Sequence, residues 1–447
     1  MKHQFVIIGA GPAGLGAAFE LKKRGLNDFL VLEAQPFVGG LSSSFVDDRG
    51  FTWDIGGHVS FSEDAGYNAL LDNVIGPDNW VYHKRNAFVF LDGAFIPFPI
   101  QNHILALSPG DQEKCVAGLL ERKGALAVSG AEDFETWIVK ILGRGLADLF
   151  MLPYNRKIWS YPLDQMSCSW VKNRVAVPDV QEVLQKKPLP PNFQAWGGNR
   201  LFRYPKEGGF GRLWQSIADT IGPEHIRLAS GVSEIRLRQK ELLLSSGESV
   251  AYERLLSTAP LDLCVNMCGS DVPQDVRGAA QELKHTSTHV VGLGLEGVPP
   301  EAWRDKTWVY SADPEVPFYR VTILSNYSPA MTPDRNRFWS VMAEVSGSPD
   351  RAKDRDSVLQ SVVQACRTLG IIGSEREICA RWHYCAPYGY PVPTLTRDLA
   401  LTLIQRFLAA QDIISFGRFG SWRYEEGNMD ACFNQGIRAA EQLVARS

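Results

Sequence analysis

The chain has 447 residues, of which 45% are hydrophobic and 21% charged, and its formal net charge is -4. This length accommodates two or three domains with an ample core, and the composition is that of a globular protein. The small negative charge gives no reason to expect nucleic acid or an anionic membrane as a partner, so an anionic substrate would need local cations. No apolar run reaches the roughly eighteen residues that a membrane-spanning helix needs.

Residues 5–33 have the pattern of a strand–helix–strand unit that binds a dinucleotide. The predicted strand, Gly-rich loop, helix and second strand cover residues 5–8, 9–14, 15–24 and 29–32. Gly9 permits the tight turn, Gly11 lets the backbone approach a pyrophosphate, and Gly14 lets the helix pack closely on the sheet. The helix N-terminus then presents unpaired N–H groups and a partial positive charge to the phosphates.

The residues after this unit favour FAD over NAD. Glu33 ends the second strand, where a carboxylate can accept from both ribose hydroxyls, which indicates an unphosphorylated ribose. A further Gly pair, Gly39 and Gly40, comes just past this strand, and Gly57 follows in the run 54–58. A second Gly-rich approach lets the backbone pass beside a long, extended cofactor, and FAD is such a cofactor.

Two other features have ordinary interpretations. Lys2 and the stretch 5–18 superficially resemble a signal peptide, but cleavage there would destroy the dinucleotide loop. We therefore expect a mature N-terminus and a cytoplasmic protein. The eight cysteines are scattered without C-x-x-C pairs or neighbouring histidine clusters, which predicts reduced core cysteines and no metal site.

The rest of the chain alternates between helical and strand patterns. Helices are predicted over residues 63–75, 109–123, 134–149, 179–185, 213–221, 357–369, 399–410 and from 430 onward. Strands are predicted as a hairpin over 87–98, as a group over 226–257 with a turn at 246–247, within 286–344, and after 413. Residues 186–191 are the clearest linker.

This order predicts an α/β fold, in which a Rossmann-like FAD-binding domain carries an inserted helical domain and a mixed or antiparallel sheet domain. The FAD-binding domain is assembled from three separate pieces, residues 1–84, 205–265 and 396–447. The helical substrate domain covers residues 105–190. The sheet substrate domain covers residues 85–104, 191–204 and 266–395.

Seven segments, in this order along the chain, are characteristic of one enzyme family. They are 56–62 (GGHVSFS), 97–102 (PFPIQN), 151–159 (MLPYNRKIW), 173–175 (NRV), 202–209 (FRYPKEGG), 317–320 (PFYR) with 325–327 (SNY), and 417–424 (GRFGSWRY). With them the sequence resembles UDP-galactopyranose mutase of the eukaryotic type over nearly its full length. Seven ordered matches are much more specific than the Gly-rich fingerprint alone.

The resemblance implies a flavoenzyme that interconverts the pyranose and furanose forms of a nucleotide-diphosphate sugar, with no net redox change. It implies that reduced FAD, with NADPH as the reductant, attacks the anomeric carbon through N5 and displaces the nucleotide diphosphate. A leaving diphosphate needs fixed cations, and arginine binds phosphate oxygens through paired hydrogen bonds. The sequence assigns no oligomeric state.

The family's site residues map by position onto this chain. The implied catalytic residues are Arg174, Arg320 and His58. The arginines bind the diphosphate, Arg320 from a mobile loop, and the backbone of His58 contacts the flavin without acting as acid or base. The implied substrate-binding residues are Arg85, Phe98, Gln101, Asn102, Phe150, Asn155, Trp159, Asn199, Tyr310, Tyr327, Tyr390, Tyr424 and Asn428. The implied cofactor-binding residues are Gly9, Gly11, Gly14, Glu33, Gly39, Gly40, Gly57, His58 and Arg418.

The chain departs from the family pattern at the nucleobase end. Where the family has Tyr-Pro-Phe-Gln-Asn-Asn, three positions differ and are Phe98, Ile100 and His103 here. Gln101 and Phe150 are kept, so a base can still stack and be read through its edge. The sequence therefore leaves the base and the sugar open.

Two other functions share the predicted cofactor domain. One is an FAD-dependent oxidoreductase of the amine oxidase or protoporphyrinogen oxidase type. Such an enzyme needs an apolar tunnel or an amine-binding aromatic cage, and it has no use for two diphosphate arginines, so Arg174 and Arg320 count against it. The other is a flavin-binding protein without catalysis, which nothing in the chain favours.

Overall fold

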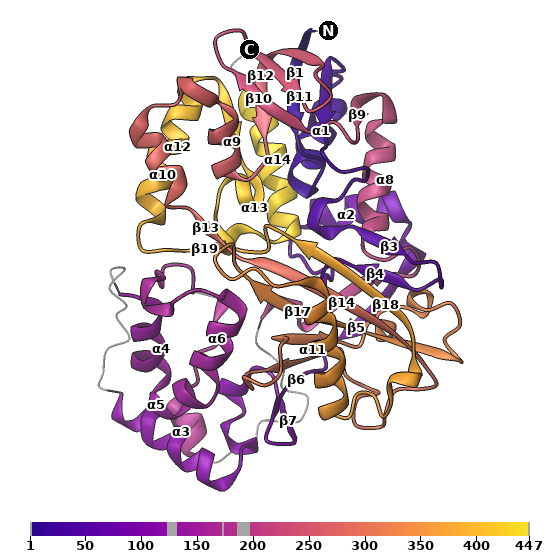
Figure 1. Cartoon of the computed structure of the whole chain (residues 1–447), viewed down its shortest axis with the longest axis vertical. Coiled ribbons are helices and arrows are strands. Elements are labelled where there is room, and N and C mark those ends of the chain that lie inside the picture. The colour runs from indigo at the N-terminus through magenta and orange to yellow at the C-terminus, as the bar shows by residue number, and fades with distance from the viewer. Residues whose placement is uncertain (1, 123–131, 172–173, 186–196, 446–447) are drawn as a thin grey trace.

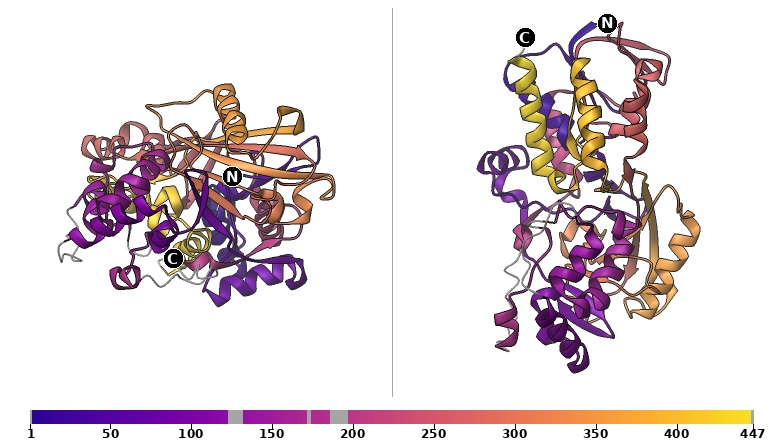
Figure 2. Two further views of the ribbon diagram at one scale, coloured as in Figure 1. Left: turned by 90° about the horizontal axis from the view of Figure 1, so that it is seen from below. Right: turned by 90° about the vertical axis from the view of Figure 1, so that its left-hand side faces the viewer.

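The computed structural model describes residues 2–122, 132–171, 174–185 and 197–445 (Figure 1). Two large sheets and a group of helices make up this part of the chain. The first sheet, its helices and both chain ends lie at one end of the molecule (Figures 1 and 2). The second sheet and the helical group lie at the other end.

The first sheet has seven strands within the described residues, in the order β10-β11-β12-β1-β2-β9, with β20 paired to β12. Its strands are β1 (Lys2–Ile8), β2 (Phe29–Leu32), β9 (Ile226–Arg227), β10 (Val232–Arg236), β11 (Glu241–Leu244), β12 (Ser249–Ser257) and β20 (Ile413–Ser415). β1 runs parallel to β2 and β12. Alternate residues of β1 face two different apolar cores, Phe5 and Ile7 on one side and Val6 and Ile8 on the other. Both faces are therefore covered, as is usual for parallel strands.

Helices cover the two faces of this sheet. One face packs against α1 (Pro12–Lys23), α2 (Ala65–Ile75), α8 (Gly211–Ile221) and α14 (Met429–Val444). The other packs against α9 (Leu261–Met267), α10 (Gln274–Gln281) and α12 (Arg397–Ala410), while the short α13 (Gly417–Gly420) precedes α14.

Helices α1 and α14 touch through their backbones. A Cβ added at Gly16 would lie 2.2 Å from the carbonyl oxygen of Phe433, and one at Gly436 would lie 2.0 Å from that of Ala13. Glycine is needed at both positions because any side chain would separate the helices. The contact holds the start of α14 beside the Gly-rich loop.

The second sheet is mostly antiparallel, in the order β18-β14-β17-β16-β15-β6-β7. Its strands are β6 (Ala87–Leu91), β7 (Ala94–Pro97), β14 (Ser287–Glu296), β15 (Trp308–Ser311), β16 (Arg320–Thr322), β17 (Phe338–Gly347) and β18 (Ile378–Ala386). Helix α11 (Arg355–Thr368) covers the outer face. The predicted hairpin over 87–98 is confirmed. Its turn residues Asp92 and Gly93 both have positive φ, 49° and 79°, as a type I′ turn requires.

In the described parts of the chain, three two-stranded ribbons lie outside the two large sheets. They are β3 (Ser44–Val46) with β4 (Thr52–Asp54), β5 (Trp80–Lys84) with β8 (Leu201–Pro205), and β13 (Lys284–His285) with β19 (Pro391–Val392). The β5–β8 ribbon joins residues that are far apart in sequence, with Tyr82 opposite Arg203.

The helical group differs from its prediction at one point. It contains α3 (Pro109–Glu121), α4 (Phe134–Leu142), α5 (Arg144–Leu146), a π-helical turn (Ala147–Met151), α6 (Leu152–Trp159) and α7 (Val180–Leu184). The single helix expected over 134–149 is wrong, because Gly143 has φ 78° and ends α4. A Cβ at Gly143 would lie 2.4 Å from the backbone of Gly118, so the chain bends there to pack against α3.

The other predicted helices and strands agree with the structure to within a few residues wherever the chain is described. The predicted linker 186–191 lies outside the described residues, and so does Asn173 of the NRV segment. Helix α10 packs in the core of the first sheet, although the predicted limits place residue 266 onward with the second sheet; the domain limits stay a prediction. Within the described chain, no helix combines the length and the apolar character needed to cross a bilayer.

Candidate active site

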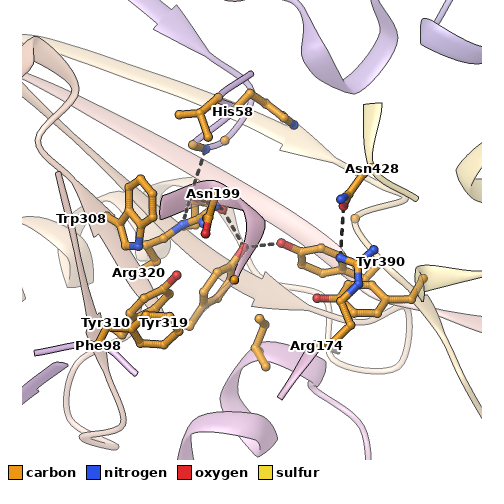
Figure 3. A pocket seen from close by; sticks show the side chains of 18 of the residues that line it. His58, Phe98, Arg174, Asn199, Trp308, Tyr310, Tyr319, Arg320, Tyr390 and Asn428 are labelled. Carbon is orange, nitrogen blue, oxygen red and sulfur yellow. Dashed lines mark hydrogen bonds and ion pairs between the residues drawn. The ribbon is translucent and has the colours of Figure 1, made fainter. Parts of the chain in front are cut away.

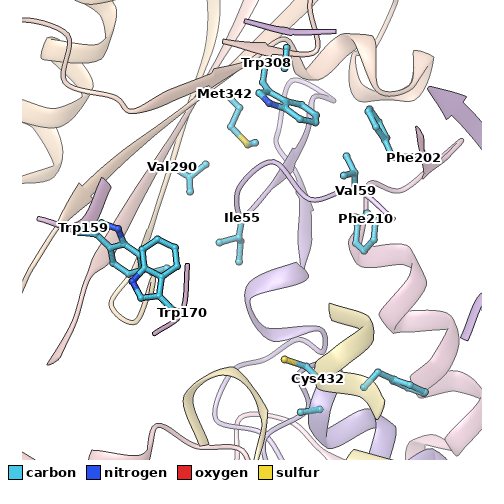
Figure 4. Packing of buried hydrophobic residues seen from close by; sticks show 14 of the residues in the cluster. Ile55, Val59, Trp159, Trp170, Phe202, Phe210, Val290, Trp308, Met342 and Cys432 are labelled. Carbon is cyan, nitrogen blue, oxygen red and sulfur yellow. The ribbon is translucent and has the colours of Figure 1, made fainter. Parts of the chain in front are cut away.

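A cavity of about 490 Å³ lies between the two sheets and the helical group. Its walls come from the loop 55–61, helix α6, strands β15 and β16, and the segment between α13 and α14. Sixteen of the predicted site residues line it: Gly57, His58, Arg85, Phe98, Gln101, Phe150, Asn155, Trp159, Arg174, Asn199, Tyr310, Arg320, Tyr390, Arg418, Tyr424 and Asn428. Buried apolar side chains, among them Ile55, Val290 and Met342, surround the site (Figure 4).

Two predicted substrate residues are not among the described residues that line the cavity. Asn102 ends a short turn, where its backbone N–H donates to the carbonyl of Pro99 at 3.0 Å. Tyr327 is fully buried and packs its ring against Phe202 and Tyr204. The predicted contact of these two residues with a substrate therefore stays a prediction.

The Gly-rich loop leaves open space where a phosphate would lie. A Cβ at Gly9, where φ is 98°, would meet Thr258 Oγ1 at 2.1 Å, and one at Gly14 would meet the carbonyl oxygen of Gly9 at 1.9 Å. At Gly11 the nearest atom would be the Cα of Gly40, at 3.9 Å. The protein itself thus requires glycine at 9 and 14 but not at 11. The open space beside Gly11 can accept a ligand that approaches the backbone closely, and the pyrophosphate of FAD is such a group.

The start of α1 and the carboxylate of Glu33 complete this cradle. Among the residues that the structure describes, no side chain caps the first turn of α1, and that turn contains no acidic residue, so its unpaired N–H groups suit an anion. Glu33 accepts from the backbone N–H of Ala10 at 2.7 Å and of Gln35 at 2.8 Å, and burial raises the pKa of its carboxyl. Gly39 donates to the Ala10 carbonyl at 2.8 Å, which places the second Gly pair directly on the loop.

Arg320 is the first residue of strand β16 and not part of a mobile loop. The loop prediction is therefore wrong, because the pairing of β16 with β17 places Arg320 opposite Glu344. Arg320 Nε donates to Glu344 Oε1 at 2.7 Å, and Nη2 donates to Oε2 at 2.9 Å. Burial would lower the pKa of Arg320, but the Glu344 carboxylate and the nearby tyrosines raise it well above the usual value. The guanidinium is charged, and a carboxylate compensates it.

The same carboxylate organises two further groups. Tyr319 donates to Glu344 Oε2 at 2.8 Å, and the backbone N–H of Gly57 donates to Oε1 at 3.2 Å. The Tyr319 and Tyr390 hydroxyls are 3.4 Å apart. Glu344 thus links Arg320 to the loop of His58 and to Tyr319.

His58 is a neutral residue of the cavity wall. Burial, together with the charges of Arg418 and Arg320, lowers the pKa of His58 to about 3. Its backbone N–H donates to the Gly56 carbonyl at 2.9 Å. An imidazole with this pKa is a poor base near neutral pH, in agreement with a role through its backbone.

Arg174 faces Arg320 across the tyrosines (Figure 3). Its Nη2 donates to the Glu425 carbonyl at 2.7 Å, and its Nη1 donates to Asn428 Oδ1 at 3.1 Å. Its guanidinium lies 5.4 Å from the ring centre of Tyr424. In the described chain no carboxylate pairs with Arg174, so its positive charge is available to a ligand.

A buried ion pair supports the turn that holds Arg174. Arg397, 1% exposed, donates from Nη1 and Nη2 to the carboxylate of Glu425, both at 3.0 Å. The backbone carbonyl of the same Glu425 accepts the hydrogen bond from Arg174 Nη2. Helix α12 therefore positions one side of the cavity.

We expect Arg174→Ala to lower kcat by about ten- to hundredfold, because the variant loses an uncompensated charge that hydrogen bonds hold in place. Arg174→Lys keeps the positive charge but lacks the planar guanidinium, so its kcat should lie between those of the wild type and Arg174→Ala. Steady-state kinetics on the protein that binds flavin normally measures both effects. A near-normal rate in Arg174→Ala would show that turnover does not depend on this charge.

Aromatic rings line the nucleobase end predicted from the sequence. Phe98 and Tyr310 have ring centres 4.6 Å apart, and Phe150 stacks on Tyr154 at 4.8 Å. Gln101 is 5% exposed, and its Oε1 has no hydrogen-bond partner among the described residues. This end offers flat apolar faces and one amide.

Sequence reasoning missed three residues that contribute to the site: Tyr154, Tyr319 and Glu344. Tyr319 and Tyr154 lie inside quoted segments, next to predicted residues, so their motifs were the available signal. Glu344 lies in a run of strand residues without a motif. Only the pairing of β16 with β17 brings it to Arg320.

Asp54 is a fully buried carboxyl at the end of β4, just before the loop 55–61. It accepts from Ser44 Oγ at 2.5 Å, Tyr204 Oη at 2.6 Å and the Phe210 N–H at 3.2 Å. Burial raises the pKa of Asp54 to about 6, more than these bonds lower it. Ionised Asp54 therefore costs folding free energy near neutral pH.

We expect Asp54→Asn to be more stable than the wild type above about pH 6 and similar to it near about pH 4. The folded carboxyl keeps a proton that the unfolded chain releases near about pH 4, so wild-type unfolding free energy falls as pH rises to about 6. The amide does not titrate and still accepts from Ser44 and Phe210. Thermal unfolding of both proteins across this range is the measurement, and parallel pH profiles would contradict the expectation.

Comparisons with known proteins agree with this geometry. The pattern that defines flavin-containing amine oxidoreductases matches residues 12–444. A crystal structure of reduced UDP-galactopyranose mutase is 34% identical, covers 100% of this chain and 95% of that chain, and superposes with a TM-score of 0.93. Putrescine oxidase bound to putrescine, 15% identical with full coverage of both chains and a TM-score of 0.68, shares the fold.

A curated relative matches over a short stretch. Zeta-carotene desaturase from Zea mays is 36% identical over 91 residues, which are 20% of this chain and 16% of the desaturase. The match spans about one sixth of that relative's length. The chain therefore belongs to the family of flavin-containing amine oxidoreductases, its full-length likeness to UDP-galactopyranose mutase is confirmed, and so is the α/β fold class expected from the sequence.

Proposed function

We propose that this protein is a flavin-dependent mutase that interconverts the pyranose and furanose forms of a nucleotide-diphosphate sugar, either UDP-galactose or a close analogue. One observation carries the proposal: a single cavity contains the loop at Gly57 and His58, the guanidinium groups of Arg174 and Arg320 on opposite sides, and tyrosine hydroxyls between these two. The likeness to UDP-galactopyranose mutase supports it. Assignment to the eukaryotic type, a cytoplasmic location and NADPH as the reductant belong to the same proposal.

The chain's own residues supply binding and charge in this reaction. Arg174 and Arg320 hold the diphosphate as it leaves the anomeric carbon and as it returns, so its charge never enters the apolar surroundings unpaired. Tyr390 and Tyr424 donate O–H groups beside them, and Asn155 contributes its amide to the wall for the sugar. These groups position both ring forms for the same bond to break and form again.

The cofactor proposed for this site is FAD, held by the Gly-rich loop, the start of α1, Glu33 and Arg418. When bound and reduced, it would supply N5 as a nucleophile toward the anomeric carbon. The protein orients the sugar against that position. His58, neutral and buried, adds no charge there.

An oxidoreductase is the second candidate. The family pattern and the desaturase match favour it, since the relatives that they name are oxidases and desaturases. The arginines count against it, because an amine or a hydrocarbon substrate brings no negative charge to bind.

One experiment separates the two functions. The purified flavoprotein is reduced with dithionite and incubated with UDP-, dTDP- and GDP-sugars, the products are separated by chromatography, and oxidised protein is the control. Isomerisation of one sugar nucleotide under reducing conditions alone is the expected result. No isomer from any sugar, together with flavin turnover driven by an added amine or other hydrogen donor, would replace the mutase with an oxidoreductase.

A further inference from the structure

Lys157 makes an unusual set of contacts on the outer side of the cavity wall. It lies on α6, and its Nζ reaches four backbone carbonyls of one loop. The distances are 3.1 Å to Ser311, 2.5 Å to Asp313, 2.8 Å to Val316 and 3.5 Å to Phe318. An ammonium group has three N–H donors, and here all of them can be used on this single loop.

The two segments that Lys157 joins both carry cavity residues. The loop 311–318 connects β15, which contains Tyr310, to β16, which begins at Arg320. On α6, Asn155 and Trp159 line the cavity on either side of Lys157 in sequence. Fixing α6 to this loop therefore fixes two walls of the cavity against each other.

A second contact, between uncharged groups, joins α6 to the second sheet beside Lys157. Ser346 on β17 donates from Oγ to the Ile158 carbonyl at 2.7 Å. It holds the end of α6 against the strand that carries Glu344. Lys157 is the group at this junction that holds the loop, and Ser346 is the group that holds the sheet.

We propose that Lys157 is a positioning residue, whose ammonium group clamps the loop 311–318 to α6 and thereby sets Arg320 and Tyr310 against Asn155 and Trp159. The role rests on the proposed mutase function, because the distance between these walls matters for a substrate that spans them. Lys157 does not touch the cavity itself, since it is absent from the described lining. Its effect passes through the backbone of the loop.

The clamp requires the charged form of the lysine. A neutral amine has two N–H donors and a lone pair that would face the carbonyl oxygens. On deprotonation the loop therefore loses one hydrogen bond from Lys157, and the lone pair repels a carbonyl oxygen. Burial lowers the pKa of Lys157 to about 8, the charge of Asp313 opposes this, and that of Lys353 adds to it. The clamp should therefore loosen in the mildly alkaline range.

The experiment compares four flavin-loaded proteins: the wild type, Lys157→Arg, Lys157→Met and Lys353→Met. For each, kcat and KM are measured from about pH 6.5 to 9.5, on either side of the titration. In parallel, hydrogen exchange is followed in the peptides that cover residues 311–322. Exchange in α10, remote from the clamp, serves as the internal reference for the pH dependence of the chemistry itself.

We expect wild-type kcat to fall on the alkaline side, with a midpoint near about pH 8. Lys157→Arg should keep kcat across this limb, since guanidinium stays charged. Lys157→Met should lose about tenfold or more in kcat at every pH, with no alkaline limb and faster exchange in the loop. The kcat of Lys353→Met should match that of the wild type near about pH 7, and its alkaline fall should move to higher pH, because the charge that repels the Lys157 ammonium is gone.

The outcomes are separable. Normal kcat together with unchanged loop exchange in Lys157→Met would overturn the clamp. If Lys157→Met does not fold, Lys157→Arg decides, and an alkaline limb identical to the wild type's would overturn it. If the reduced wild type isomerises no nucleotide sugar, the proposed function fails, whereas the exchange of the loop in the variants still tests the clamp.

Discussion

Replacing Arg320 with alanine is expected to lower turnover in the proposed mutase reaction by about 10²- to 10³-fold, because the leaving diphosphate of that reaction would lose a fixed cation. The same change should also destabilise the fold. Glu344 is 2% exposed and would lose the guanidinium that now pairs with it through two hydrogen bonds. Removing one partner of a buried ion pair costs about 3–5 kcal/mol.

The double variant Arg320→Met/Glu344→Gln separates these two effects. It contains no buried unpaired charge, so its unfolding free energy should return most of the way to that of the wild type. Its turnover should stay low, since the cation is still missing. Thermal unfolding and steady-state kinetics on the wild type, Arg320→Met, Glu344→Gln and the double variant complete the cycle. Recovery of turnover in the double variant would show that Arg320 acts through stability alone.

Replacing Gly11 with valine is expected to give a folded protein without flavin. A Cβ at this position meets no protein atom closer than 3.9 Å, so the backbone of the loop can accept it. The side chain would occupy the space that faces the uncapped start of α1 and exclude a pyrophosphate. The purified variant should therefore lack the yellow colour of bound flavin and have no activity.

Gly110→Val is the matched control for that variant. Gly110 is exposed in the first turn of α3, and a Cβ there meets no atom within 4 Å. This control should bind flavin like the wild type. Absorbance of the bound flavin and circular dichroism of both proteins measure cofactor content and folding. A fully yellow Gly11→Val protein would contradict the placement of the pyrophosphate.

The two arginines differ in their electrostatic surroundings, and this difference bears on how the site binds an anion. Arg320 is compensated by Glu344, which also holds Tyr319 and the backbone of Gly57. Arg174 is bound by a carbonyl and an amide. At these two residues the proposed diphosphate would meet an uncompensated charge on Arg174 and, on Arg320, a charge whose direction Glu344 fixes in advance.

Much of the fold could be predicted because its signals are local. The turn at Asp92 and Gly93, the helix starts and the glycines at 9 and 14 follow from conformational preferences of a few neighbouring residues. The family resemblance then predicted, without a structure, sixteen of the residues that line the cavity, from Gly57 to Asn428. Asn102 and Tyr327, which the resemblance also implies, are not among the described residues that line the cavity, and their role stays a prediction.

The α/β class, the dinucleotide cradle and the set of cationic and aromatic residues available to a site can all be deduced from the sequence. The tertiary structure decided which of these groups are compensated and which are free. Glu344 meets Arg320 through strand pairing, Lys157 meets the loop 311–318 through the packing of α6, and Gly143 bends the chain because α3 lies against it. Each of these contacts joins residues distant in sequence. No local preference encodes them, because register and packing set the direction of a side chain only when the whole fold is formed.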